Sequence, residues 1–215
     1  NPVVANDSLL SVIQNIPQVS HVQRYATKPG MIMTADNFQG MIVKGVAQEY
    51  DWTYLKAHLQ EGEIPALTDS VASNRVLVSR SMADKLSLKG GDKLYTYYIE
   101  GNVRARRLTV SGIFQTNFSA FDDYFLITDM YTVNRLNGWE PDQVGGVEVA
   151  VSDYRFLNSV NDDIRGHIQE QTDRYGAIYC SRTSEELYPQ IFAWLDLLDT
   201  NVWVILILMT GVAGF

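Results

Sequence analysis

Residues 75–114 decide the fold and read RVLVSRSMADKLSLKGGDKLYTYYIEGNVRARRLTVSGIF. The stretch opens with a β-branched run at 75–78, which predicts a buried strand. Ser79 follows as the cap of a short helix over 81–86, and the pair Gly90-Gly91 permits a turn with positive φ. Two β-rich runs complete the stretch, so it predicts a strand, a helix and a β-hairpin in succession.

The hairpin over 93–110 has a defined expected register. Its runs KLYTYYI and VRARRLTV flank Glu100-Gly101-Asn102, and Gly-Asn suits a two-residue loop. With that loop, Tyr97 faces Arg106 and Tyr95 faces Leu108. The first pair is expected to form an exposed cation–π contact worth about 0.5–1 kcal/mol.

The residues before this stretch predict a helix followed by a meander of strands. Asp7 or Ser8 can cap a helix within 1–18, and Pro17 ends it. We then expect strands at 19–28, 31–33 and 38–46 and a short helix at 50–59.

The residues after the stretch continue the mixture of strands and helices. The patterns predict a strand at 124–127, a helix at 131–136 capped by Asp129, a strand at 147–151, a helix at 156–172 and a strand at 177–180. Thr183 and Glu186 then form a capping-box pattern that opens a last amphipathic helix. Its apolar stripe continues without a turn signal into the C-terminal segment.

Residues 202–215 read VWVILILMTGVAGF and carry no charge. A membrane-spanning helix needs roughly 20 apolar residues, so we interpret this run as the start of a truncated transmembrane helix, with a buried core helix as the alternative. Trp203 suits an interfacial anchor. The boundary at Asp196 and Asp199 has no nearby Lys or Arg, which favours a non-cytoplasmic location for everything upstream.

Composition excludes several classes of protein. Of 215 residues, 46% are hydrophobic, which argues against wholesale disorder. The formal charge of −8 argues against nucleic-acid binding, because neutralising phosphates requires a basic face. The single cysteine, Cys180, excludes a disulfide framework and any multi-cysteine metal site.

No catalytic, cofactor-binding or metal-binding constellation emerges from the remaining polar residues. His21, His58 and His167 have no ligand-like spacing to one another or to Cys180. We expect the adjacent acids Asp122-Asp123 to shape a loop and Asp162-Asp163 to lie on a solvated helix face. An acid–base pair needs two carboxylates across a cleft, which adjacent residues rarely provide. We therefore expect a non-enzymatic domain without a cofactor.

Other short motifs are equally unspecific. Lys89-Gly90-Gly91-Asp92 lacks the spacing of a phosphate-binding loop, and Cys180 is expected in an apolar strand where a thiol is inert. Arg104, Arg106 and Arg107 form a basic cluster that protects a hairpin edge or meets an acidic partner or lipid headgroups. The triplets at 6–8 and 117–119 match the glycosylation pattern, which has meaning only in a eukaryotic secretory host.

Several segments, in order, resemble one known family. Residues 76–79 and 82–94 (VLVS and MADKLSLKGGDKL) resemble its strand followed by "lA..LGv..GD.v". Residues 108–114 (LTVSGIF) resemble its "f.VvGiF" strand, and residues 122–127 resemble the segment that follows. Residues 192–215 resemble the amphipathic helix that enters the second membrane span. The family is that of the extracytoplasmic domains of MacB/LolC/LolE/FtsX-type ABC transporter permeases.

The resemblance implies a domain organisation and a location. It implies a porter-like, discontinuous α+β domain formed by residues 1–44 and 145–201, with a smaller β-rich domain inserted over 45–144 and the start of a transmembrane helix at 202–215. It places residues 1–201 on the periplasmic side of a bacterial inner membrane. The lipoprotein-releasing members recruit a carrier through a longer, Pro-containing hairpin, whereas this hairpin turns tightly, so we transfer no carrier-binding residues.

The implied function is mechanical. Such a domain couples ATP hydrolysis by a cytoplasmic ATPase, separate or fused, to periplasmic transport or lipoprotein release. Its expected partners are that ATPase, a second permease copy or paralogue, a periplasmic partner and the membrane, but not nucleic acid. A ligand-sensing ectodomain of a membrane receptor is the alternative, and a soluble enzyme a more distant one.

Overall fold

A computed structural model of the protein describes residues 2–190 except 35, 36, 69, 101, 117 and 170, and in addition 192, 193 and 209. Of the predicted membrane segment 202–215, all but Met209 lies outside the described residues, as does most of the expected last helix. Within the described part of the chain, no helix is both long enough and apolar enough to cross a bilayer.

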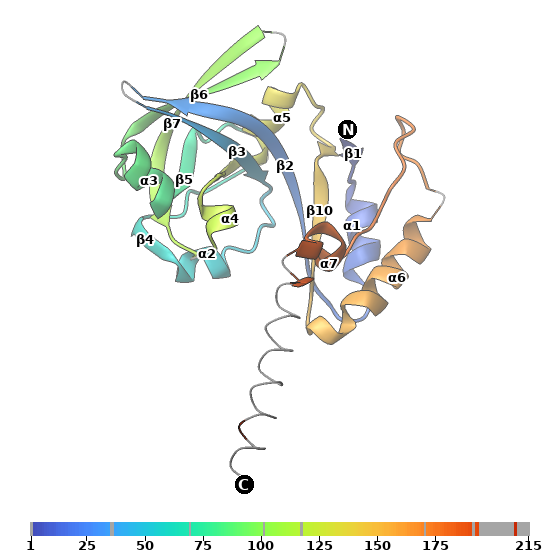
Figure 1. Ribbon diagram of the computed structural model, residues 1–215. Helices are drawn as coiled ribbons and strands as arrows, with labels where there is room; N and C mark the ends of the chain where they lie inside the picture. Colours follow the sequence, from blue (N-terminus) through green and yellow to red (C-terminus); the bar gives the residue numbers. More distant parts are fainter. Residues whose placement is uncertain are drawn as a thin grey trace.

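Two lobes share one long strand, β2 (Val19–Met33) (Figure 1). The α/β lobe holds β1 (Val3–Val4), α1 (Asp7–Gln14), β9 (Gln143–Val144), β10 (Gly146–Val151), the 3-10 turn η1 (Tyr154–Phe156), α6 (Leu157–Ile168) and α7 (Ser184–Leu187). The β-rich lobe holds β3 (Phe38–Val46), α2 (Thr53–Ala57), β4 (Leu59–Gly62), β5 (Arg75–Ser79), α3 (Arg80–Leu86), β6 (Lys93–Glu100), β7 (Asn102–Phe114), α4 (Ser119–Asp122), β8 (Phe125–Asp129) and α5 (Met130–Asn137). The predicted α+β fold class is confirmed.

The β-rich lobe is a closed barrel. The main sheet runs β10-β2-β3-β8-β5-β7-β4, and β6 pairs with both β7 and β2. The strands β2, β3, β8, β5, β7 and β6 therefore form a ring that returns to β2. Because the ring is closed, each of these strands has a hydrogen-bonded neighbour on both sides, and side chains fill the interior.

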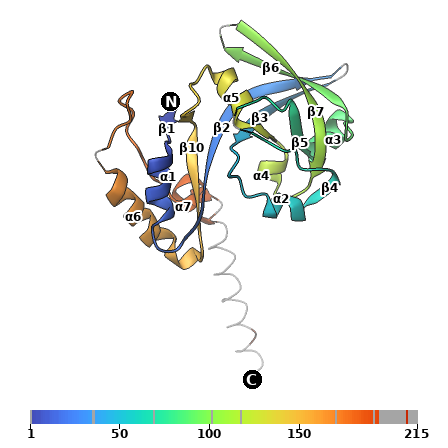
Figure 2. The same ribbon diagram turned by 180° about the vertical axis from the view of Figure 1, so that it is seen from behind.

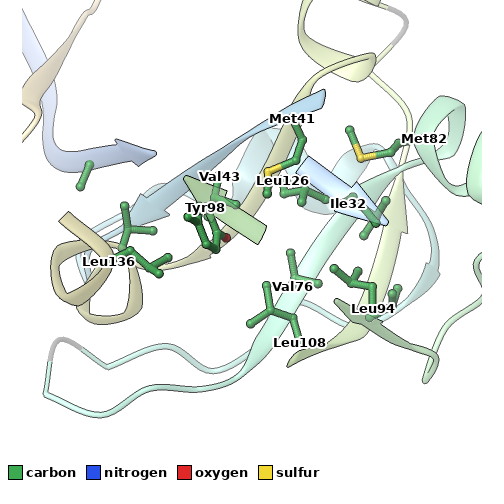
Figure 3. Packing of buried hydrophobic residues seen from close by; sticks show 14 of the residues in the cluster. Ile32, Met41, Val43, Val76, Met82, Leu94, Tyr98, Leu108, Leu126 and Leu136 are labelled. Atoms are coloured by element: carbon green, nitrogen blue, oxygen red, sulfur yellow. The ribbon is translucent and has the colours of Figure 1, made fainter. Parts of the chain in front are cut away.

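Each lobe has a buried hydrophobic cluster, and Ala5 and Val144 of the α/β lobe also belong to the cluster of the barrel. The barrel interior is filled by apolar side chains at most 3% exposed, among them Ile32, Met41, Val43, Val76, Leu94, Tyr98, Leu108 and Leu126 (Figure 3). A further buried cluster of Val46, Leu55, Leu77, Phe114 and Ile127 lies beneath α2 and the β4 region. In the α/β lobe, α1 and α6 pack together on Val22 of β2 through Ile13, Ile16, Val160, Ile164 and Ile168. The 3.6-residue spacing of these positions explains why both segments are helical.

Two predicted helix caps of the β-rich lobe are confirmed. The hydroxyl of Ser79 accepts a hydrogen bond from the amide of Met82 at 3.1 Å, and the carboxylate of Asp129 accepts one from Thr132 at 2.6 Å. The capping box of Thr183 and Glu186 is also present, although its helix α7 ends at Leu187. The first helix differs, because Asn6 caps α1 in place of the predicted Asp7 or Ser8.

β2 is continuous where two strands were predicted. It passes through Pro29, which is paired with Ile42 of β3. The amide of Ile42 donates to the carbonyl oxygen of Tyr124 in the direction of β8, so the nitrogen of Pro29 points away from β3. On that other side of β2, Pro29 lies between Tyr25, the last residue paired with β10, and Met31, the first paired with β6. No ladder hydrogen bond is lost there, and proline is tolerated. At the next position, a Cβ on Gly30 would lie 2.8 Å from the carbonyl oxygen of Tyr97, so glycine permits β6 to cross closely.

The predicted register of the β6–β7 hairpin is wrong by one residue. Glu100 pairs with Asn102, so Tyr97 faces Ala105 and Tyr95 faces Arg107. Arg106 lies opposite Thr96 and not opposite Tyr97. The facing of Tyr97 and Arg106, on which the expected cation–π contact depended, therefore does not occur. A slip of one residue exchanges the two faces of a strand, and the barrel interior selects the register that buries Leu94 and Leu108 as a directly opposed pair.

The predicted strand at 177–180 is also wrong. Only an isolated bridge between Thr172 and Ile178 forms there. The segment is held instead by the buried carboxylate of Asp173, which accepts hydrogen bonds from the amides of Val4, Tyr175 and Ala177 at 3.1, 2.9 and 2.8 Å. Although burial raises the pKa of Asp173, these hydrogen bonds lower it overall. The preceding helix α6 ends at Ile168, four residues before the predicted end at Thr172.

Candidate functional site

The histidines and paired acids that the sequence singled out do not converge. The ring of His21 lies 2.7 Å from the carbonyl oxygen of Glu49, and that of His58 lies 2.9 Å from the carbonyl oxygen of Tyr54. His167 is exposed on α6, as are Asp162 and Asp163. Among the residues that the structure describes, no three His, Cys, Asp or Glu side chains converge as metal ligands.

The acids at 122–123 shape the loop between α4 and β8. The Asp122 carboxylate accepts hydrogen bonds from the amide and hydroxyl of Thr116. Asp123 accepts hydrogen bonds from Ser81 and Lys85, and these hold the pKa of its carboxyl below the ordinary value. Both acids are thus engaged in positioning neighbouring segments.

The remaining sequence motifs lie apart from one another. Cys180 is exposed and outside any strand, so the prediction of a thiol in an apolar strand is wrong. The loop 89–91 borders an open groove of about 610 Å³ together with Glu61, Glu63 and Arg75. Glu63 and Arg75 pair with each other at 2.8 Å across this groove. Arg104 donates to the carbonyl oxygen of Leu136 at 3.2 Å and so anchors the hairpin to the C-terminal end of α5.

One face of the barrel wall exposes several large apolar side chains. We call it the outer face and define it by Met33, Phe38, Tyr95, Ile99 and Val103, which are 46–78% exposed. Met33 pairs with Phe38 across β2 and β3, and Ile99 pairs with Val103 across β6 and β7. Directly opposed residues project from the same side of a sheet, so each pair presents a joint apolar surface.

Register joins these pairs into one surface. Met31 of β2 pairs with Tyr97 of β6, which places Met33, two residues on, and Tyr95 and Ile99, two residues to either side, on that same side. The opposite side carries Ile32, Leu94 and Tyr98, which are all buried. The strands of the outer face thus carry apolar residues on both sides, one side buried in the core and the other exposed. Contiguous exposed apolar patches mark interaction sites.

The charges that accompany the outer face are positive. Arg107 lies opposite Tyr95, and Lys93 lies two residues before Tyr95 on the same side. Both side chains are exposed. Among the described residues that share this side of β6 and β7, none is acidic. The connected ends of β6 and β7 project at the end of the molecule away from α7 in both views, and β7 continues from there toward β4 (Figures 1 and 2).

A second feature lies where the chain leaves the α/β lobe. Here α7 and the residues before it are bonded to α6, an arrangement we call the α7 junction. Arg165 of α6 donates to both carboxylate oxygens of Glu186 at 2.9 and 3.0 Å and to the carbonyl oxygen of Ser181 at 3.2 Å. The hydroxyl of Ser181 bonds to Asn161 at 2.6 Å. The C-terminal chain is thus fixed to α6 by side chains and not by packing alone.

The 3-10 turn η1 adds to the α7 junction. The hydroxyl of Tyr154 donates to Glu185, and its ring stacks on Phe192 with a centroid distance of 6.3 Å. The hydrogen bond from the amide of Thr183, together with Arg165, holds the pKa of Glu186 below its ordinary value. Glu186 is therefore ionised at neutral pH and keeps both partners.

Neither the outer face nor the α7 junction was identified from sequence as a functional feature. A signal for the outer face exists, because Tyr95, Tyr97 and Ile99 alternate with Leu94, Thr96 and Tyr98, so both sides of the strand are largely apolar. A strand that is apolar on both sides is typical of burial on both sides. The capping box was identified, but its partner Arg165 lies 21 residues away along the chain.

Comparison with known proteins agrees with this fold. The family model described as "MacB-like periplasmic core domain" matches residues 2–167. The extracellular domain of the noncanonic ABC-type transporter YknZ from Gram-positive bacteria is similar in structure, with a TM-score of 0.55, 14% sequence identity, and coverage of 84% of this chain and 91% of that one. The periplasmic region of MacB from Actinobacillus actinomycetemcomitans has a TM-score of 0.52 and 13% identity, with coverage of 86% and 81%.

No curated protein matches the sequence. The two structural likenesses concern the fold alone, because their sequence identities are low. The family model spans most of the chain and covers both lobes, from β1 to α6. The chain belongs to the family of MacB-like periplasmic core domains, which form the extracytoplasmic part of MacB-type ABC transporter permeases.

Proposed function

We propose that this domain transmits conformational change between the membrane part of an ABC transporter permease and a partner on the extracytoplasmic side. ATP would be hydrolysed by a cytoplasmic ATPase, and the result would be transport or lipoprotein release. The α7 junction is the observation that carries the proposal. Its hydrogen bonds link the C-terminal chain to α6, so that a movement of that chain is passed to the α/β lobe.

The proposal retains the interpretation of residues 202–215 as the start of a membrane helix and the location of residues 1–201 outside the cytoplasm of a bacterium. It also retains the division into a discontinuous domain, residues 1–44 and 145–201, and an inserted domain, residues 45–144. Membership of a permease family favours this function over a sensory ectodomain. The domain itself would be non-catalytic and would bind no cofactor.

The outer face supports the expectation of an extracytoplasmic partner. It is apolar at its centre and carries Lys93 and Arg107, so it suits a protein surface of apolar residues rimmed by carboxylates. A symmetric contact between two outer faces would bring these cations against each other, which disfavours self-association. Its position away from α7 is consistent with a partner that binds on the side remote from the membrane.

Crosslinking between the two copies of the permease tests the transmission. Tyr188, directly after α7, is 58% exposed and accepts a cysteine in a Cys180→Ser background. In the full-length permease with its ATPase, we expect the yield of Tyr188→Cys crosslinks between copies to change on addition of ATP. A catalytically inactive ATPase that still binds ATP serves as the control for the hydrolysis step. Equal yields with and without ATP would contradict the proposal.

A further inference from the structure

A dense polar cluster lies where the two lobes meet, and it belongs to neither hydrophobic core. Its centre is Lys44 of β3, whose ammonium lies 2.5 Å from the carboxylate of Glu148 on β10. The two strands are not neighbours, because β2 lies between them in the sheet. The ion pair therefore spans β2 and joins a strand of the barrel to the edge strand of the α/β lobe.

Lys44 is enclosed on further sides. Its side chain is 11% exposed, and its ammonium lies 5.3 Å from the ring centre of Tyr25 and 5.8 Å from that of Tyr50. Burying an ammonium is unfavourable unless charge and dipole partners replace the lost water. One carboxylate and two aromatic rings supply such partners. Burial, followed by the charge of Glu148, raises the pKa of Tyr50 to about 12, so this ring stays neutral.

The carboxylate of Glu148 is held on its other side as well. Gln23 of β2 donates to its second oxygen at 2.9 Å. The amide oxygen of the same Gln23 accepts a hydrogen bond from the backbone of Asp51 at 3.0 Å. Gln23 thus connects Glu148 to the segment 47–52, which leads from β3 to α2 in the β-rich lobe.

A second ion pair fastens the same segment. Arg24 of β2 donates to both oxygens of Glu49, at 2.7 and 3.1 Å, and its backbone amide donates to the same carboxylate at 3.1 Å. Burial acts to raise the pKa of Glu49, but the hydrogen bonds from Arg24 lower it overall. The ring of His21 contacts the carbonyl oxygen of Glu49 at 2.7 Å. The segment 47–52 is therefore bonded to the α/β lobe along three residues of β2.

We infer that this cluster is an interlobe clasp, formed by Lys44 with Glu148 and by Arg24 with Glu49, that holds the two lobes in one orientation. Apart from these ion pairs, the lobes are joined by β2 and by apolar contacts in which Ala5 and Val144 of the α/β lobe pack on the barrel cluster. Neither connection carries a charge pair that fixes the angle between β3 and β10. With the clasp, a displacement of the α/β lobe at the α7 junction carries the outer face along. The inference deepens the proposed function, on which its functional meaning rests.

The orientation of the lobes can be measured without nucleotide. Spin labels on Lys56 of α2 and Asp163 of α6, both exposed, report the distance between the lobes in the full-length permease, with Cys180→Ser as background. We expect one narrow distance distribution in the parent protein. Lys44→Met and Glu148→Gln should each add a second, displaced peak or broaden the first, because the ion pair that spans β2 is lost.

Matched variants make the result specific. Lys85→Met removes the ion pair of Lys85 with Asp123, 2.9 Å apart and contained within the β-rich lobe, and should leave the distribution unchanged. If Lys44→Met fails to fold, Glu148→Gln decides, since it keeps the shape of the side chain and removes only its charge. A distribution that stays as narrow in the folded clasp variants as in the parent, or that is already broad in the parent, overturns the clasp.

Failure of the clasp is distinguishable from failure of the proposed function. The interlobe distance in the absence of ATP reports only the clasp, whereas the dependence of Tyr188→Cys crosslinking on ATP reports only the transmission. Stability is not the readout, because replacing a buried ion pair with an apolar side chain can leave stability unchanged or raise it.

Discussion

Replacing Asp129 with alanine is expected to lower the free energy of unfolding by about 3–5 kcal/mol, the largest effect of any single substitution considered. Asp129 is fully buried, and its carboxylate caps α5 through the amide of Thr132. The same carboxylate accepts hydrogen bonds from the amide and hydroxyl of Ser73, at 3.0 and 2.7 Å. Alanine leaves the buried amide of Thr132 without its partner and removes the acceptor of the half-buried Ser73, which is more unfavourable than losing an exposed cap.

Thermal and urea unfolding measure this effect, and a decrease of the melting temperature by roughly 10 °C or more is expected. Asp153→Ala is the matched control, because Asp153 also caps a helical turn but is only partly buried and bonds to Arg155, two residues on. We expect the control to change stability by no more than about 0.5 kcal/mol. Equal effects of the two substitutions would show that burial of the Asp129 carboxylate does not matter.

Placing a carboxylate on the outer face is expected to reduce partner binding by about tenfold or more. The charge would lose its water in an apolar contact, and a loss of about 1.4 kcal/mol in binding free energy corresponds to a tenfold change. Val103→Glu makes this change at a residue that is 66% exposed. Binding is measured in cells as photocrosslinking from a benzoylphenylalanine that replaces Tyr95 in the full-length permease. The partner is expected to present apolar and acidic residues to this position.

Two further variants sharpen this experiment. Gly40→Trp adds bulk to the same side of β3, and a Cβ on Gly40 meets no atom within 4 Å, so the fold should accept it. Val71→Glu is the control, because Val71 is similarly exposed but lies in the loop before β5. Loss of the crosslink in Val103→Glu and Gly40→Trp but not in Val71→Glu is expected. A crosslinked product that contains two permease copies would instead identify the outer face as a contact between copies.

The local signals in the sequence predicted most of the elements. Ser79, Asp129 and Thr183 were recognised as caps because a cap depends on amides only two or three residues away. The strands at 38–46, 75–78 and 147–151 were recognised because their apolar residues either alternate with polar ones or form a continuous β-branched run. Such features hold irrespective of where the rest of the chain lies.

The features that failed depend on distant parts of the chain. The hairpin register is selected by the barrel interior, which requires Leu94 and Leu108 to face inward together. The segment 177–180 has the composition of a strand. Its first residue, Ala177, instead donates its amide to the carboxylate of Asp173, which also accepts the amide of Val4, and the segment does not join the sheet. Neither interaction leaves a periodic trace in the sequence.

The functional surfaces were harder still to predict. The hairpin is apolar on both sides, and only closure of the barrel determines which side remains exposed as the outer face. The clasp brings together Lys44 and Glu148, which are 104 residues apart along the chain. Ordinary charged residues at such a separation give no local signal, so the sequence alone does not predict this ion pair.

The most direct test of transmission through the whole domain is the distance between the two outer faces of a permease dimer. Spin labels at Val103→Cys in both copies, in a Cys180→Ser background with the ATPase present, report this distance with and without ATP. We predict that ATP shifts the distance while the separation between Lys56 and Asp163 within each copy stays constant. An ATP-dependent change at Tyr188 with no change at Val103 would contradict the account.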